Sequence, residues 1–154
     1  MSKCLLAGLF LLVAGCSVPQ EESEPDTDPL YFESIGRGQH GARRDTIETV
    51  ARTAEAWAEL SATVRPIAEF EAVNFEQQMA ALIAIPTESG GYTIEVESVE
   101  ALDGVITVAY VVNVPGIDCI TPTALALPFQ AVSIRKAEGA VEFERRNEPF
   151  KCGM

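Results

Sequence analysis

Alternating apolar and polar residues predict a β-hairpin in the middle of the chain. Tyr92, Ile94 and Val96 fall on one side with threonine and glutamate between them, which is typical of a strand with one buried face. Residues 105–112 are apolar on both sides, which indicates a central strand covered on both faces. Asp103-Gly104 lies between the two segments and tolerates positive φ, so the strands should pair antiparallel across a tight turn.

Further apolar segments predict the remaining strands and one helix. Strands are expected at residues 31–35, 45–52, 79–85, 129–136 and 141–146, the last two forming a second hairpin across Glu138-Gly139. Thr53 is a good N-cap for a helix of about three turns that ends before Pro66 and packs Trp57 onto the sheet. We therefore expect an α+β class, mostly β, with a small antiparallel sheet and one short helix; a sandwich-like arrangement is an open alternative.

The loop before the hairpin is the candidate functional segment. Adjacent glycines allow backbone angles and close approaches that a Cβ would forbid, so this turn could be tight and could act as a wedge. The candidate partner-binding residues are Thr87, Glu88, Ser89, Gly90, Gly91 and Tyr92. The alternative is that Gly90-Gly91 only forms a hairpin turn between the strand ending at Ile85 and the strand starting at Tyr92.

Length and charge limit the function classes. The chain has 154 residues, enough for one domain with a modest core. It carries 11 Lys and Arg against 23 Asp and Glu, a net charge of −12, which argues against nucleic acid as a partner. The basic pairs Arg43-Arg44, Arg135-Lys136 and Arg145-Arg146 are scattered among acids and are interpreted as solvated strand ends.

The first residues predict a targeting segment. The apolar run 5–13 is too short for a membrane-spanning helix, and Val13-Ala14-Gly15-Cys16 resembles the lipobox of bacterial lipoproteins. That resemblance implies a signal peptide at residues 1–15 and a lipid on Cys16; an ordinary secretory signal with an incidental cysteine is the alternative. Ser17 is not the aspartate that retains lipoproteins in the inner membrane, so the resemblance implies anchoring in the outer membrane, facing the periplasm or the cell surface.

The segment after Cys16 predicts a spacer. Residues 16–30 are rich in proline and acids and hold almost nothing apolar, which is typical of a disordered, self-repelling tether. The folded domain is then expected at residues 31–154.

Cysteine usage predicts one disulfide. Processing would remove Cys4 and lipidate Cys16, which leaves Cys119 and Cys152 in an oxidising compartment, where they should pair. The chain-entropy model gives such a bond about 4 kcal/mol. A metal or redox pair is the weaker alternative, because the chain has no C-x-x-C arrangement and one histidine, His40.

We find no sequence signature of catalysis. The chain contains none of the motifs G-x-S-x-G, H-E-x-x-H, G-x-x-x-x-G-K and G-x-G-x-x-G. His40 is expected at the surface, and the carboxylates of Glu95 and Glu97 are expected on a solvated face. The sequence therefore predicts a protein that is not an enzyme and needs no cofactor or metal.

Residues 73–136 resemble the C-terminal domain of the protease complex subunit PrcB family. The resemblance is carried by Asn74-Phe75 before an apolar strand, the turn Ser89 to Ile94, Asp103-Gly104 before a valine-rich strand, Pro115-Gly116, Cys119, and residues 121–128 before Val132. It implies a lipid-anchored, non-catalytic accessory subunit that stabilises an extracytoplasmic protease. The loop Pro86 to Tyr92 is also loosely similar to a loop of chagasin-type cysteine protease inhibitors, so a direct inhibitor is the alternative.

Overall fold

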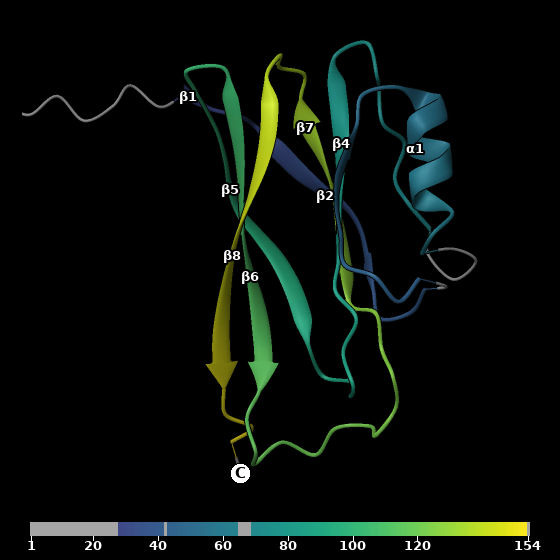
Figure 1. Cartoon of the computed structure of the whole chain (residues 1–154), viewed down its shortest axis with the longest axis vertical. Helices are drawn as coiled ribbons and strands as arrows, with labels where there is room; N and C mark the ends of the chain where they lie inside the picture. Colours follow the sequence, from purple (N-terminus) through teal and green to yellow (C-terminus); the bar gives the residue numbers. More distant parts are fainter. Residues whose placement is uncertain (1–27, 42, 65–68, 154) are drawn as a thin grey trace, which may run out of the picture.

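The computed structural model describes residues 28–41, 43–64 and 69–153. These residues form two four-stranded sheets and one short helix, so the mostly β class is confirmed (Figure 1). The predicted signal peptide, Cys16, most of the tether and Pro66 lie outside the described residues.

The first sheet is built around the predicted hairpin. Its strand order is β1 (Asp28–Pro29), β5 (Thr93–Leu102), β6 (Val105–Pro115) and β8 (Ala140–Phe150). Strands β5 and β6 pair antiparallel, and Asp103 and Gly104 have φ of 50° and 79°, so the predicted turn is confirmed. Strand β8 pairs in parallel with β6, which corrects the expectation of a purely antiparallel sheet.

The second sheet packs against the first across an apolar core. Its order is β2 (Phe32–Gly38), β7 (Phe129–Arg135), β4 (Gln78–Ala84) and β3 (Ile47–Ala51), and all its pairs are antiparallel. The apolar core between the sheets includes Met79 and Ile83 from β4 and Val108 and Val112 from β6. The sandwich-like alternative is therefore the correct one.

Helix α1 (Ala54–Ser61) forms a third layer on the outer face of the second sheet (Figure 1). Thr53 caps it as predicted, accepting a hydrogen bond from the Ala56 N–H. Trp57 is buried in a second core against β4 and β7, as expected of a core anchor. The helix is shorter than predicted: Ser61 and Thr63 donate hydroxyl hydrogen bonds to Ala58 O and Leu60 O, which compete with the helical backbone bonds.

The second predicted hairpin is wrong. Strands β7 and β8 belong to different sheets, so the segment across Glu138-Gly139 is a crossover. Two contacts hold the crossover in place: Arg52 donates to Ala137 O and, at 2.8 Å, to Gly139 O, and the Ala140 N–H donates to Gly104 O at 3.1 Å. The inward Val141 and Phe143 then pack on the first core beside β6.

Three further predictions change, two of them on boundaries and one on burial. Asp28–Pro29 pairs with β5 and Leu30 is buried, so the end of the predicted tether is part of the fold. Residues 36–38, which follow the strand expected at residues 31–35, continue β2. On the outward face of β6, Val105 and Ala109 are half-buried and Val111 is buried, so this central strand is fully buried on its inner face and only partly on its outer face.

Candidate binding surface at the loop end

Two long connections lie side by side at one end of the sandwich. Residues 86–92 link β4 to β5, and residues 116–128 link β6 to β7. Thr87 and Ala126 exchange backbone hydrogen bonds of 2.9 and 3.0 Å, and the Gly90 N–H donates to Pro122 O at 3.0 Å. The two connections therefore form one backbone-bonded surface.

The glycine pair is required by this contact. Gly91 has φ of 91°, and a Cβ there would lie 2.8 Å from Thr121 Cγ2. A Cβ on Gly90 would lie 3.2 Å from Pro122 Cδ. Because β4 and β5 belong to different sheets, the hairpin-turn interpretation of Gly90-Gly91 is wrong. The glycines instead allow one loop to approach another.

The predicted partner-binding residues divide by exposure. Thr87 donates its hydroxyl to Ser89 O at 2.8 Å, and Tyr92 packs against the first core, so both support the loop itself. Glu88 and Gly91 are exposed, whereas Ser89 and Gly90 are half-buried. The side chain most available to a partner in this segment is Glu88.

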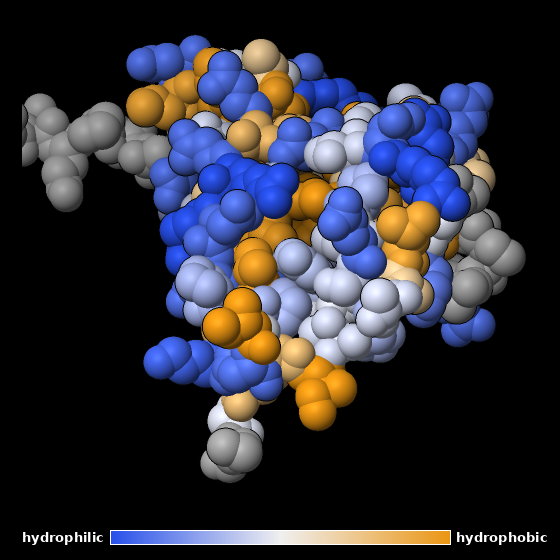
Figure 2. Space-filling model, turned by 60° about the horizontal axis from the view of Figure 1, so that its bottom comes forward, coloured by the Kyte–Doolittle hydropathy of each residue, from blue (hydrophilic) through white to orange (hydrophobic). Residues whose placement is uncertain are grey.

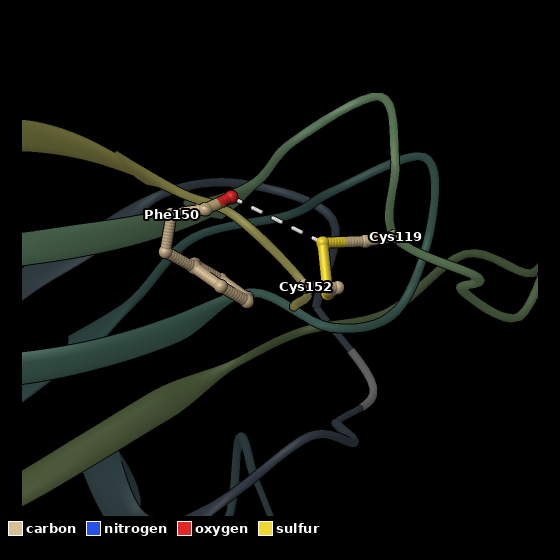
Figure 3. The surroundings of a disulfide bond; sticks show 3 residues. All are labelled: Cys119, Phe150 and Cys152. Atoms are coloured by element: carbon tan, nitrogen blue, oxygen red, sulfur yellow. Dashed lines mark hydrogen bonds between the residues drawn. A yellow bond between two sulfur atoms is a disulfide. The ribbon is translucent and has the colours of Figure 1, made fainter. Parts of the chain in front are cut away.

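A disulfide joins the second loop to the end of β8. Cys119 and Cys152 are bonded, with their Cα atoms 5.0 Å apart, which confirms the predicted pair (Figure 3). The Gly116 N–H also donates to Phe150 O at 2.9 Å. Figure 3 shows the carbonyl of Phe150 facing the sulfur of Cys119, so the loop is fixed to β8 through both backbone and side chains.

Exposed apolar side chains gather on the tip of this loop, residues 116–120. Ile117 and Ile120 are fully exposed, with relative exposures of 109 % and 103 %, and Leu125 further along is 64 % exposed. Figure 2 shows hydrophobic residues projecting from this end among polar ones. Sequence reasoning missed the tip; the available signal was isoleucine on either side of a disulfide cysteine in a loop rich in proline and glycine.

A cleft of about 310 Å³ lies beside the two loops. It is lined by Gln39, His40, Gly41, Arg43, Arg44, Pro86, Thr87, Leu125, Ala126 and Leu127, and we call it the basic cleft. The Leu127 N–H donates to Gln39 O at 2.9 Å, and Gln39 Nε2 donates to Tyr92 O at 2.8 Å, which ties its walls together. Within the described residues, the buried Gln39 Oε1 has no hydrogen-bond partner.

The chain enters the domain at the opposite end. Asp28 and Pro29 pair with Ala101 and Glu100, next to the β5–β6 turn. The tip follows the other end of β6, and a strand of 11 residues spans about 35 Å. Figure 1 shows β1 at the top of the sandwich and the C-terminus at the bottom. The loop surface is therefore the end of the domain farthest from the entering chain.

Two further findings concern the described part of the chain. No three side chains among His, Cys, Asp and Glu gather in a way that could hold a metal ion. No helix in the same residues is long and apolar enough to cross a bilayer.

The fold and loops define a two-sheet β domain whose candidate binding surface lies at one end of the sandwich. Residues 85–135 match the family model described as PrcB C-terminal, which confirms the resemblance over that segment. The match includes both loops, the β5–β6 hairpin and Cys119, whereas β8 and Cys152 lie beyond it. Comparison with curated proteins and with solved structures finds no match.

Proposed function

We propose that this protein is a lipid-anchored, non-catalytic protein-binding domain of the cell envelope, acting as an accessory and stabilising subunit of an extracytoplasmic protease. The observation that carries the proposal is the tip with its fully exposed Ile117 and Ile120. Exposed apolar side chains grouped at one end of a domain mark interaction sites, because hydrating them costs free energy that a partner removes. The family match at residues 85–135 supports the protease as the class of partner.

The rigidity of the tip supports the same conclusion. The disulfide and the bond from Gly116 to Phe150 fix the loop to β8, which limits the movement of the backbone that carries Ile117 and Ile120. A rigid apolar surface loses little conformational entropy on binding, which favours affinity. Anchored through Cys16, the domain would present this tip away from the membrane, since the chain enters at the other end.

The test is capture from native envelope extract by the full-length chain. We expect the wild type to retain one proteolytically active protein, and Ile117→Ser with Ile120→Ser to lose it while the melting temperature stays unchanged. Leu102→Ser is the matched control, because Leu102 is an exposed apolar residue at the opposite end of the sandwich. Equal capture by the tip variant and the wild type would contradict the proposal.

A second candidate function is direct inhibition of a protease through the loop Pro86 to Tyr92. The captured protease distinguishes it from the first candidate, a stabilising subunit. The self-supporting bonds of Thr87 and the exposure of Glu88 favour this candidate, because inhibitory loops are rigid and project from their scaffold. A stabilising subunit should lengthen the active half-life of the captured protease. An inhibitor should lower its rate of hydrolysis, and Glu88→Ala with Ser89→Ala should restore that rate.

A further inference from the structure

The basic cleft is lined by basic side chains, although the protein as a whole is acidic. The whole chain has a net charge of −12, yet Arg43, Arg44 and the single histidine, His40, line this cleft. Among the described residues that line it there is no aspartate or glutamate. A concave surface with cationic side chains and no acids attracts an anion even when the protein as a whole is acidic.

The arginines of the cleft are available to a ligand. Arg43 has one acid nearby, Asp45 at 3.9 Å, and both side chains are more than half exposed. Exposed pairs at this distance contribute little free energy. Arg44 forms no ion pair within the described residues. Guanidinium groups bind carboxylates through paired, charge-assisted hydrogen bonds, so two neighbouring arginines are well suited to a carboxylate.

Apart from Gln39 and Thr87, the remaining lining of the cleft is apolar. Pro86 and Leu125 contribute hydrocarbon surface, and Leu125 is 64 % exposed, whereas Leu127 is buried behind them in the second core. A volume of about 310 Å³ is at the small end of ligand pockets and holds one or two amino-acid residues. Because the walls are joined by the backbone bonds between Thr87 and Ala126, the cleft is largely preformed.

We propose that the basic cleft binds the carboxyl-terminal end of a peptide chain, with the terminal carboxylate on Arg43 and Arg44 and an apolar last side chain against Pro86 and Leu125. A terminal residue carries its carboxylate and side chain on the same carbon, which suits a small cleft with one cationic and one apolar side. An internal aspartate or glutamate would need the chain to leave the cleft in two directions. The inference rests on the proposed protein-binding function and names the chemistry of one segment of the partner.

The test is a titration of the ¹⁵N-labelled full-length chain, followed by the amide resonances of Gln39, Thr87 and Leu127. The probe is N-acetyl-tetraalanyl-leucine with a free carboxylate. The amidated peptide and an amidated peptide with an internal glutamate are the comparisons. We expect the free carboxylate to bind at least about tenfold more tightly than either amide, which is the effect of losing hydrogen bonds to a charged group.

Variants assign the effect to the cleft. Arg43→Gln with Arg44→Gln should remove the preference for the free carboxylate. Arg145→Gln with Arg146→Gln, the adjacent exposed pair on β8, makes the same change of charge elsewhere and should retain it. Retention of the wild-type amide spectrum shows that each variant is folded.

Three outcomes overturn the inference: equal binding of the free and amidated peptides, equal binding of the internal-glutamate peptide, or no shift of the cleft resonances with any probe. If the peptides fail while capture still depends on Ile117 and Ile120, this inference alone is wrong. If the peptides bind the cleft but capture does not depend on the tip, the proposed function is wrong and the cleft assignment stands.

Discussion

Gly139 has no space for a side chain where the crossover passes the β5–β6 turn. Its φ is 134°, and a Cβ would lie 2.2 Å from the carbonyl oxygen of Gly104. Gly104 has φ of 79°, but a Cβ there would meet nothing within 4 Å. A side chain at Gly104 would therefore introduce backbone strain alone, whereas a side chain at Gly139 would introduce both backbone strain and steric overlap.

Substitution by alanine should reveal this difference in the free energy of unfolding. Gly104→Ala introduces only left-handed strain, about 1–2 kcal/mol. Gly139→Ala adds a clash with backbone that cannot move without disturbing the pairing of β8 with β6, so its loss should be clearly larger. Urea unfolding of both variants measures the difference, and equal losses would show that the crossover is free to shift.

Tyr110 links the two sheets through its hydroxyl. It projects from β6 into the first core and donates to Glu48 Oε1 on β3. Burial raises the pKa of the Tyr110 phenol well above its ordinary value of 10.0, and the hydrogen bond to Glu48 raises it further.

This pKa shift predicts a loss of stability in alkali. Above pH 10 the unfolded chain releases the Tyr110 proton while the folded chain retains it, so the unfolded state binds fewer protons and the free energy of unfolding falls as pH rises. Tyr110→Phe should flatten this decline in denaturant titrations between pH 9 and 11. Tyr31→Phe, which changes an exposed ring, should leave most of the decline in place.

Among the helices, strands and turns, the features that depend on a few neighbouring residues were predicted from the sequence. Asp103-Gly104 specified its turn, Thr53 specified the helix start, and the alternation after Tyr92 specified the inner face of β5. The second hairpin failed because Glu138-Gly139 resembles a turn signal, whereas Gly139 serves a long-range contact with Gly104. Parallel pairing of β8 with β6 depends on partners distant in sequence, which no short pattern shows.

The Cys119–Cys152 disulfide, which joins the loop after β6 to the end of β8, can be tested directly. Cys119→Ala with Cys152→Ala should lower the free energy of unfolding by up to about 4 kcal/mol, since the bond closes a separation of 33 residues in the unfolded chain. Capture of the partner should weaken as well, because the tip would keep only its backbone tie to β8. In the denatured, unreduced wild type, thiol labelling of Cys119 and Cys152 should find neither free; full labelling of both would contradict the bond.

At the scale of the molecule, the candidate site could not be predicted as a whole. Arg43-Arg44 was interpreted as a solvated strand end because nothing in its own segment indicates a cleft. The cleft exists only where residues 39–41, 43 and 44 meet residues 86–87 and 125–127, and their meeting depends on which sheet each strand joins. The loop 86–92 was identified in the sequence, whereas its contact with residues 121–126 was not.

The positions of the chain entry and the loop surface predict how an anchored domain would be oriented at the membrane. The described chain begins beside the β5–β6 turn, and the tip and basic cleft lie around the loops at or near the other end. A lipid on Cys16 would therefore hold the domain with its candidate binding surfaces facing away from the bilayer. Two or more acyl chains give stable attachment, where a single chain gives only marginal binding.

Substitution of Cys16 tests this arrangement directly. Cys16→Ala should move the protein from the membrane to the soluble fraction and leave residues 1–15 attached, because both lipidation and cleavage require that cysteine in a lipobox. Cys4→Ala is the matched control: it removes the other cysteine of the leader and should leave anchoring and processing unchanged. Fractionation with mass spectrometry of the N-terminus measures both properties. A Cys16→Ala form that stays as firmly membrane-bound as the wild type would show that the attachment does not depend on lipid at this residue.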